Sequence, residues 1–456
     1  MDLGRNGGGE SVSRRSLLRS IGASGLVGLA GCGGSEGVTD SGGTPTPTTI
    51  GNYPVSGDSV TFGINVASSG TYSPAGQQEL LGFELAVKHI NSGGGWVTAE
   101  GYESPLDGDG LLDKAVDFAV EDTGSSSDAA RRNAQRLVDS EEAIMLTGGT
   151  SSNSAVANQE VAAQNQVVYM STTAHANSLT GAACNRYSFH EMFNSHMTAE
   201  ALAPVLRAEY GADVSYAKFF EKSDWGAAFR EDIDTALGEL GWSPVWEYNA
   251  QAGTSDYSQY AADIESVDFD VIVLGFRGFD AVNALRAFRE AFPDADIVLP
   301  LASLEVARTA GEAIEGVVGT VAWSPAIDSS LSDAFRESFR EEYGSTTGSS
   351  DSAVPSGPAH IAYTQTLQYA SAVERAGTFD PREVIAELEG HEYDAGLGSQ
   401  TLRSCDHQAM RRVPVVKGKS EVQHSYGTYY SLVGEPAQVR YACDSGPAAN
   451  CSLGES

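Results

Sequence analysis

Short apolar strands alternate with amphipathic helices along most of this sequence, and this alternation limits the fold more than any other feature. β-branched residues predict a strand at 59–67, and apolar residues at helical spacing predict a helix at 77–90. The same order then repeats as strand 116–121, helix 128–138, strand 143–147, helix 154–164 and strand 167–171. Alternation of this kind predicts an α/β fold with parallel, doubly wound sheets.

A second series of the same kind begins after a crossover near residues 189–196. It consists of helix 197–210, strand 215–220, helix 225–240, strand 242–248, helix 257–267, strand 271–275 and helix 280–291. Two similar series predict two lobes, each with its own sheet. In open α/β sheets, ligands bind at the carboxyl ends of the strands, beside helix N-termini that favour anions. Two such edges that face each other would enclose a small molecule.

The N-terminal segment predicts export and lipid anchoring. Arg14 and Arg15 precede an apolar run at 21–30, which is too short to span a membrane and fits a twin-arginine signal peptide. Leu-Ala-Gly-Cys at 29–32 resembles a prokaryotic lipobox, in which the thiol of Cys32 takes the lipid. The expected segments are a signal peptide at 1–31 and a disordered tether, rich in Gly, Ser, Thr and Pro, at 32–57.

Acidic residues outnumber basic residues along the whole chain. Of 456 residues, 61 are Asp or Glu and 28 are Lys or Arg, which gives a formal net charge of -33. This charge argues against a nucleic-acid partner, because binding phosphates requires Lys and Arg. A distributed acidic surface is typical of proteins from extreme halophiles, where salt screens the repulsion between carboxylates. An ordinary acidic extracellular protein is the alternative.

Four cysteines remain once Cys32 is assigned to lipidation, and these are Cys184, Cys405, Cys443 and Cys451. In an exported protein, an even number of cysteines predicts two disulfides, and four cysteines allow three pairings. Metal binding is the alternative, but no two of these cysteines have the C-x-x-C spacing of metal sites. We expect neither a metal site nor a cofactor.

Three pieces of sequence carry a family resemblance that extends over residues 60–434. They are SSGTYSPAGQQELLGFELAVKHINSGGG, then EDTGSSSDAARRNAQRLVDSEEAIMLTGGTSSNSAVA with VVYMSTTAHANSLT after it, and finally LGSQTLRSCDHQAM. In order and spacing they resemble the extracellular substrate-binding lipoproteins of ABC transporters of the branched-chain amino acid (leucine/isoleucine/valine-binding) type. These proteins have the type I periplasmic-binding-protein fold, and the acidic composition points to a haloarchaeal member.

The resemblance implies two parallel-sheet lobes joined by a hinge of three strands. The chain should cross between the lobes near 189–194, near 323–326 and near 393–398, so both lobes are discontinuous in sequence. The implied division is lobe 1 at 58–190 and 326–392, lobe 2 at 191–325 and 393–440, and a C-terminal tail at 441–456.

Two loops of lobe 1 are expected to line the cleft. Ser151 and Ser152 lie between a strand and a helix, and the resemblance assigns Ser152 to the carboxylate of the ligand. Capping of the helix is the alternative role for either serine. The resemblance places Thr173, Ala174 and His175 in the second loop, with backbone contacts from Ala174. His175 stands where family members carry a Thr or Ser that helps to hold an amino acid.

Two aromatic residues of lobe 2 are also candidates for the site. The resemblance lets the ring of Trp225 stack over the ligand, and packing in the core is the alternative. Phe276 belongs to the loop 275–278, which follows a strand and should face the cleft. The family's carboxylate for the ligand's amino group aligns with 299–305, where no acid occupies that position and Glu305 is only nearby.

The resemblance implies a solute-binding component of an ABC importer, not an enzyme. It would capture a small polar molecule, a branched-chain amino acid or a similar amino acid or amide, by hinge closure and deliver it to a permease. We expect a monomer that is lipid-anchored at the extracellular face of the cell membrane. A ligand-binding lipoprotein that acts with a chemoreceptor or sensor is the alternative. A hydrolase is a remote alternative, because His190, Glu191 and His196 miss the H-E-x-x-H spacing.

Overall fold

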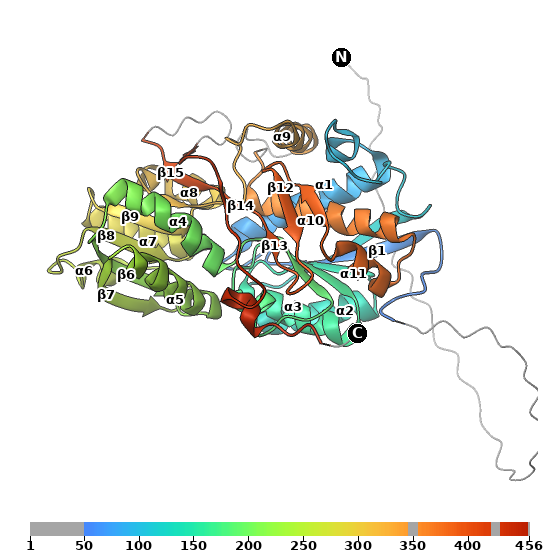
Figure 1. Cartoon of the computed structure of the whole chain (residues 1–456), viewed down its shortest axis with the longest axis horizontal. Coiled ribbons are helices and arrows are strands. Elements are labelled where there is room, and N and C mark those ends of the chain that lie inside the picture. Colours follow the sequence, from blue (N-terminus) through green and yellow to red (C-terminus); the bar gives the residue numbers. More distant parts are fainter. Residues whose placement is uncertain (1–49, 345–353, 421–428, 455–456) are drawn as a thin grey trace, which may run out of the picture. The chain divides into compact units, whose positions relative to one another are not determined.

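Two open sheets, both flanked by helices, organise the chain (Figure 1). The computed structural model describes residues 50–344, 354–420 and 429–454. The expected signal peptide, Cys32 and the tether up to residue 49 lie outside the described residues. None of the described helices has both the length and the apolar character needed to cross a membrane.

The first sheet is parallel and has the strand order β2-β1-β3-β4-β5. Its strands are β1 (Ser59–Val66), β2 (Ala115–Asp122), β3 (Met145–Gly148), β4 (Val168–Ser171) and β5 (Ser188–His190). The helical segments that connect them are α1 (Ser73–Ser92), η1 (Gly95–Thr98), α2 (Ser127–Asp139), α3 (Ser152–Asn165) and η2 (Asn177–Thr180). We refer to this sheet and the elements packed on it as lobe 1.

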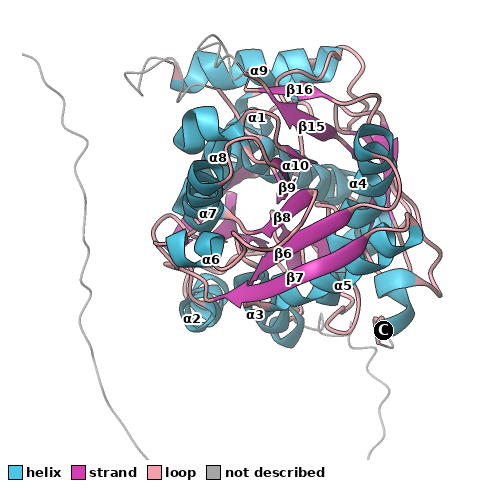
Figure 2. Ribbon diagram, turned by 90° about the vertical axis from the view of Figure 1, so that its left-hand side faces the viewer, coloured by secondary structure: helices cyan, strands magenta, loops and turns pink. Residues whose placement is uncertain are grey.

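The second sheet has the order β16-β15-β10-β9-β8-β6-β7 and forms lobe 2. Its strands are β6 (Ser215–Glu221), β7 (Ser243–Ala250), β8 (Val271–Gly275), β9 (Asp296–Leu301), β10 (Val318–Thr320), β15 (Val415–Gly418) and β16 (Tyr430–Leu432). Its helical segments are α4 (Ser195–Tyr210), α5 (Asp224–Glu239), α6 (Ser258–Ala262), α7 (Gly278–Ala291), α8 (Leu304–Ala310) and η3 (Gly311–Ile314). Figure 2 shows β6, β7 and β8 side by side with helices around them. The prediction of an α/β fold with parallel sheets is confirmed, with β15 and β16 added antiparallel at one edge.

Three later helices return to lobe 1, namely α9 (Ser330–Tyr343), α10 (Gly357–Ala376) and α11 (Pro381–Leu388). Their apolar side chains belong to the same buried cluster as those of β1 and α1. Helices α1 and α10 approach so closely that Gly82 has no room for a side chain. A Cβ atom at Gly82 would lie 2.0 Å from the carbonyl oxygen of Ala359.

Two connections between the lobes precede α9. One lies between β5 and α4 and the other between β10 and α9. The third crossing falls later than the predicted 393–398. Leu402 and Ala409 pack in the cluster of lobe 1, whereas Met410 and Val413 pack with lobe 2, so the chain changes lobe between residues 409 and 410.

A small antiparallel sheet explains this later crossing. It consists of β11 (Glu392–Asp394), β12 (Ser399–Leu402) and β13 (Ala409–Met410). Because these strands pair with one another in a meander, the chain stays on the lobe 1 side as far as Ala409 instead of crossing at 393–398.

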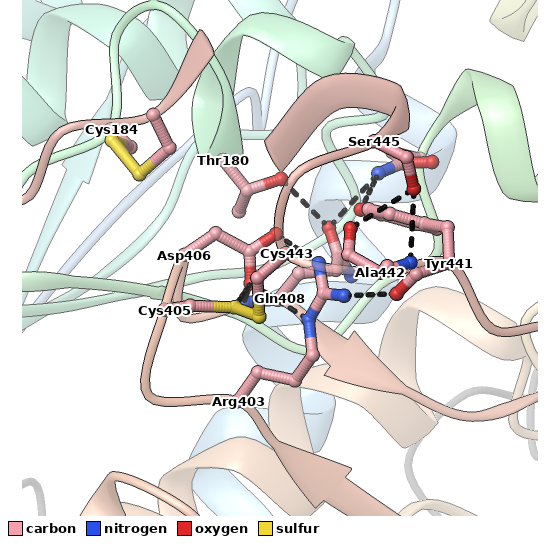
Figure 3. A network of polar contacts seen from close by, with 12 residues as sticks. Thr180, Cys184, Arg403, Cys405, Asp406, Gln408, Tyr441, Ala442, Cys443 and Ser445 are labelled. Carbon is pink, nitrogen blue, oxygen red and sulfur yellow. Dashed lines mark hydrogen bonds and ion pairs between the residues drawn. A yellow bond between two sulfur atoms is a disulfide. The ribbon is translucent and has the colours of Figure 1, made fainter. Parts of the chain in front are cut away.

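The C-terminal segment is held to the rest of the chain by disulfides and by contacts between Arg403 and Tyr441 (Figure 3). Disulfides join Cys184 to Cys451 and Cys405 to Cys443, which is one of the three pairings that the sequence left open. The guanidinium of Arg403 lies 4.3 Å from the ring centroid of Tyr441. The remaining elements of this region are β14 (Arg412–Val413), which pairs with β17 (Ala437–Gln438), and η4 (Gly446–Asn450).

Candidate functional site

Loops at the carboxyl ends of parallel strands from both lobes line one cavity, as the fold predicts. The loop after β1 contributes Tyr72, the loop after β3 contributes Thr150, and the segment after β4 contributes Thr173 and His175. From lobe 2, the loop after β8 contributes Arg277. Apolar residues complete the wall, among them Leu301, Leu304, Val306 and Val321. We call this space the inner cavity.

Side chains from the two lobes contact each other beside the inner cavity. The hydroxyl of Tyr72 in lobe 1 donates a hydrogen bond of 2.9 Å to Oε1 of Glu221 in lobe 2. The guanidinium of Arg277 lies 4.8 Å from the ring centroid of Tyr72 and 4.7 Å from that of Trp225. Nη2 of Arg277 is 3.9 Å from Glu221 Oε1. The lobes therefore meet here through Tyr72, which contacts the carboxylate of Glu221 and the guanidinium of Arg277.

A second, polar cavity adjoins the first and shares Tyr72 and Arg277 with it. Its wall includes residues 125–127 at the start of α2, residues 151–153 at the start of α3, and residues 221–223 before α5. Backbone N–H groups at helix N-termini favour anions. We call this space the outer cavity, and its lining suits a negatively charged group.

The buried carboxylate of Glu79, on α1, accepts hydrogen bonds from both the loop after β3 and the segment after β4. Thr150 Oγ1 donates to Glu79 Oε2 at 2.6 Å, and Thr172 Oγ1 donates to Oε1 at 2.9 Å. The hydroxyl of Thr173 also donates to Oε1. Burial raises the pKa of Glu79, and these hydroxyl donors oppose that increase because they stabilise the charged form.

His175 is held as a neutral ring at the wall of the inner cavity. Its Nδ1 lies 2.8 Å from the carbonyl oxygen of Phe193, which can only accept a hydrogen bond. Nδ1 therefore carries the proton, and Nε2 is left as an acceptor. Burial holds the pKa of His175 well below its ordinary value, so the ring stays neutral at physiological pH.

The two predicted serines lie at the outer cavity rather than at the inner one. Ser151 is the N-cap of α3, and its Oγ accepts from the backbone N–H of Ser154 at 3.3 Å. Ser152 Oγ accepts from the backbone N–H groups of His175 at 3.3 Å and Ala176 at 3.2 Å. The Ser152 side chain therefore holds the second loop against the first.

Three other predicted residues, Ala174, Trp225 and Phe276, line neither of the two cavities. Ala174 is buried, and its carbonyl accepts from His190 Nε2 at 2.7 Å. Trp225 and Phe276 are buried in the two apolar clusters of lobe 2. The face of Trp225 that we assigned to a ligand is covered by the guanidinium of Arg277, so the core alternative describes this residue better.

Tyr72, Glu79 and Glu221 were not predicted from the sequence, and Arg277 was predicted only as part of the loop 275–278. A signal for Glu79 does exist, because its spacing puts it on the same helix face as Phe83. An acidic residue on an apolar helix face indicates a buried polar contact. Among the described residues, no cluster of His, Cys, Asp or Glu side chains could hold a metal ion.

Comparison with known proteins gives the family. The model of the family described as periplasmic binding protein matches residues 59–423. The chain belongs to this family. A Leu/Ile/Val-binding protein homolog of Brucella abortus is 27% identical over 248 residues, which cover 53% of this chain and 57% of that protein. The chain thus matches little more than half the length of this relative.

Solved structures share the fold at lower identity. An amino acid ABC transporter substrate-binding protein of Pseudomonas fluorescens superposes with a TM-score of 0.75 at 20% identity, covering 88% of this chain and all of that one. A branched-chain amino acid transporter substrate binding protein of Streptococcus pneumoniae, in complex with isoleucine, gives 0.68 at 19% identity, covering 82% and 99%. A solute binding protein of R. palustris, in complex with benzoate, gives 0.70 at 18% identity, covering 83% and 97%. The family and these neighbours are solute-binding proteins rather than enzymes.

Proposed function

We propose that this protein is the solute-binding component of an ABC importer. It captures a small amino-acid-like molecule between its lobes and delivers it to a permease. The observation that carries the proposal is the inner cavity, whose wall comes from both lobes and combines Arg277 with Thr173, His175 and apolar side chains. A few placed polar groups in an apolar wall are typical of small-molecule sites.

The solute is bound as the two lobes close about the hinge. The contact between Tyr72 and Glu221 spans the lobes, so the lobes must separate there before a solute can enter. A ligand that touches both walls binds the closed arrangement more tightly than the open one and shifts the population toward it. The permease would then recognise the closed, loaded form.

The ligand contacts that we propose lie in both cavities. Thr173 and His175 contact the solute in the inner cavity, and Ser151 and Ser152 contribute at the outer cavity, where α3 begins. Trp225 acts on the site indirectly, through its contact with the guanidinium of Arg277.

A ligand screen by thermal shift, in high salt, tests the function. A ligand at 100 times its dissociation constant stabilises the folded protein by about 2.7 kcal/mol. We expect a branched-chain amino acid to raise the melting temperature of the wild type and of Arg131→Gln, whose exposed side chain pairs with Glu160 on the surface. Arg277→Gln should lose that shift. A screen in which no amino acid stabilises the wild type contradicts the proposal.

The proposed location is the outer face of the cell membrane, after twin-arginine export and lipidation of Cys32. Changing Cys32 to Ala should release the protein into the medium and leave ligand affinity unaltered, because the tether only connects the lobes to the lipid. Fractionation of cells that express each form measures this. A Cys32→Ala protein that stays in membranes after a salt wash contradicts the anchor.

A further inference from the structure

We propose that the C-terminal segment 437–451 acts as a strap between the lobes, and that it positions the wall of the inner cavity at His175. The disulfide between Cys405 and Cys443 closes the strap, and Tyr441 is the positioning residue that links it to the wall. The inference rests on the proposed function, because the wall that the strap positions is the one at which the solute binds.

The strap begins in lobe 2. Its strand β17 pairs antiparallel with β14, so that Ala437 lies opposite Val413. Val439 is buried in the same apolar cluster of lobe 2 as Val413. As far as residue 439, the segment therefore belongs to lobe 2.

The disulfide then fastens the strap to lobe 1. Cys405 lies in the loop between β12 and β13. In that loop, the ring of His407 stacks on Phe189 of β5 with 4.0 Å between the ring centroids, and its Nδ1 lies 3.1 Å from the carbonyl oxygen of Ser188. The loop is thus held on lobe 1, and the bond from Cys405 to Cys443 brings the strap there (Figure 3).

The strap and the third connection, which crosses between residues 409 and 410, belong to one covalent ring. Strands β15 and β16 of lobe 2 lie between Cys405 and Cys443 in the sequence, so the ring passes through both lobes. This fourth link removes open arrangements that three main-chain connections would allow. A solute that binds the closed arrangement gains apparent affinity when fewer open arrangements compete with it.

Tyr441 joins the strap to the first connection, which runs from β5 to α4. Its hydroxyl accepts a hydrogen bond of 2.8 Å from Asn194 Nδ2. Asn194 is also the N-cap of α4, and its Oδ1 accepts from the backbone N–H of Met197 at 3.0 Å. Arg403, in the same loop as Cys405, donates from Nη1 to the carbonyl oxygen of Tyr441. Tyr441 therefore connects the disulfide-bonded loop with the start of α4.

The two residues that flank Asn194 hold His175 in the wall of the inner cavity. The carbonyl oxygen of Phe193 accepts from His175 Nδ1 at 2.8 Å. The backbone N–H and the hydroxyl of Ser195 both donate to the carbonyl oxygen of His175, at 2.9 and 3.0 Å. His175 is thus held by its ring and by its backbone. A displacement of Asn194 therefore reaches this wall through its immediate neighbours.

A strap that only stabilised the fold would give different results. A disulfide restricts the unfolded chain, so its removal lowers the melting temperature whatever the strap does in the folded protein. Two properties of the folded protein separate these roles. One is the affinity for L-leucine, measured by calorimetric titration of the full chain. The other is the hydrogen-exchange rate of the backbone N–H of Ser195, which donates to His175.

Two variants release the first connection from the strap. Cys405→Ala combined with Cys443→Ala opens the covalent ring. Tyr441→Phe keeps both disulfides and removes only the hydroxyl that accepts from Asn194, so it remains informative if the cysteine variant does not fold. Each should weaken L-leucine binding by about threefold to tenfold, as the loss of one hydrogen bond predicts, and should speed up exchange at Ser195.

Matched controls remove the same chemical groups elsewhere. Cys184→Ala combined with Cys451→Ala removes the other disulfide and leaves the ring beside Tyr441 closed. Tyr187→Phe removes a hydroxyl that accepts from Gln166 Nε2 at 3.1 Å within lobe 1. Both controls should match the wild type in affinity for L-leucine and in exchange at the first connection.

The outcomes separate the strap from the function that it rests on. Unaltered affinity in both the opened ring and Tyr441→Phe overturns the inference, whatever happens to the melting temperature. An equal loss of affinity in the control without Cys184 and Cys451 also overturns it, because the loss of any disulfide would then explain the effect. If the wild type does not bind L-leucine, the proposed function fails in its branched-chain form, and exchange at Ser195 decides about the strap. Faster exchange in the two variants then supports the strap, and unchanged exchange overturns it.

Discussion

Asp280 illustrates how burial of a single carboxylate changes the response of this protein to pH. The side chain lies at the start of α7 with 1% of its surface exposed, and Oδ2 accepts from the backbone N–H of Gly253 at 2.7 Å. Burial raises the pKa of Asp280 to about 6, because the charged form loses its water. An unfolded aspartate has a pKa of about 3.9.

Asp280→Asn should therefore stabilise the protein at neutral pH and not in acid. The folded pKa is raised, so the cost of ionising Asp280 is fully present above about pH 6 and disappears as the pH falls toward 4. The asparagine oxygen can still accept from Gly253 and carries no charge at any pH. Melting temperatures of both proteins at pH 7 and pH 4 measure the effect. A difference in melting temperature between the wild type and Asp280→Asn that is the same at pH 7 and pH 4 would contradict the raised pKa of Asp280.

The sequence located the loops of the site better than the side chains within them. We predicted Phe276 as a site residue, but its neighbour Arg277 lines the cavity instead. Of the predicted residues Thr173, Ala174 and His175, only Thr173 and His175 line the wall. In extended loop segments, consecutive side chains point to opposite sides, so an error of one residue exchanges a lining group for a core group. Periodicity cannot resolve such an error without knowing which side the cavity occupies.

At the scale of elements, the repeating strands and helices of both lobes followed from the sequence. Strand β8 has the predicted bounds, 271–275, whereas the helix expected at 257–267 extends only over α6, Ser258–Ala262. The small sheet β11 to β13 was not foreseen. Its strands are two to four residues long, which is too short for an alternation of apolar and polar residues to stand out.

The contact between α1 and α10 predicts different effects for two glycine substitutions. Gly82→Ala should lower the free energy of unfolding by about 1–3 kcal/mol, because the new Cβ overlaps a backbone carbonyl that cannot rotate away. Gly238→Ala, in α5, is the control, since a Cβ there meets nothing within 4 Å. That change should be neutral or stabilise by up to about 1 kcal/mol, because Ala favours helix. Urea denaturation of both variants tests this, and equal stabilities would contradict the close contact.

At the scale of the whole molecule, net charge sets the expected dependence on salt. With a net charge of -33, carboxylates repel one another over most of the surface. Dilution from molar salt to about 0.01 M extends the Debye length from about 3 Å to about 30 Å and exposes this repulsion. If the protein is halophilic, its melting temperature should fall steeply on dilution. A melting curve that is the same in both conditions would favour the ordinary acidic alternative.

The lobes are also linked through a buried cation at the hinge. Arg411 is fully buried in the third connection, and its Nη2 donates to the carbonyl of Ala322, in the second connection, at 2.6 Å. Nη1 lies 3.5 Å from the carbonyl oxygen of Glu191, in the first connection. The carboxylate of Glu191 is also buried, accepts from Thr364 at 2.6 Å and interacts electrostatically with Arg411. One side chain thus joins all three connections.

Removal of this cation should cost more than the loss of its hydrogen bonds. Arg411→Met is expected to lower the free energy of unfolding by about 3–5 kcal/mol, because Glu191 is left as a buried charge without a compensating partner. Adding Glu191→Gln to the same chain should recover a large part of that loss, since a neutral amide needs no counter-charge. Urea denaturation of the wild type, both single variants and the double variant gives the coupling energy between the two side chains. A double variant no more stable than Arg411→Met would mean that Arg411 acts through packing and its bond to Ala322 alone, and that the charge argument is wrong.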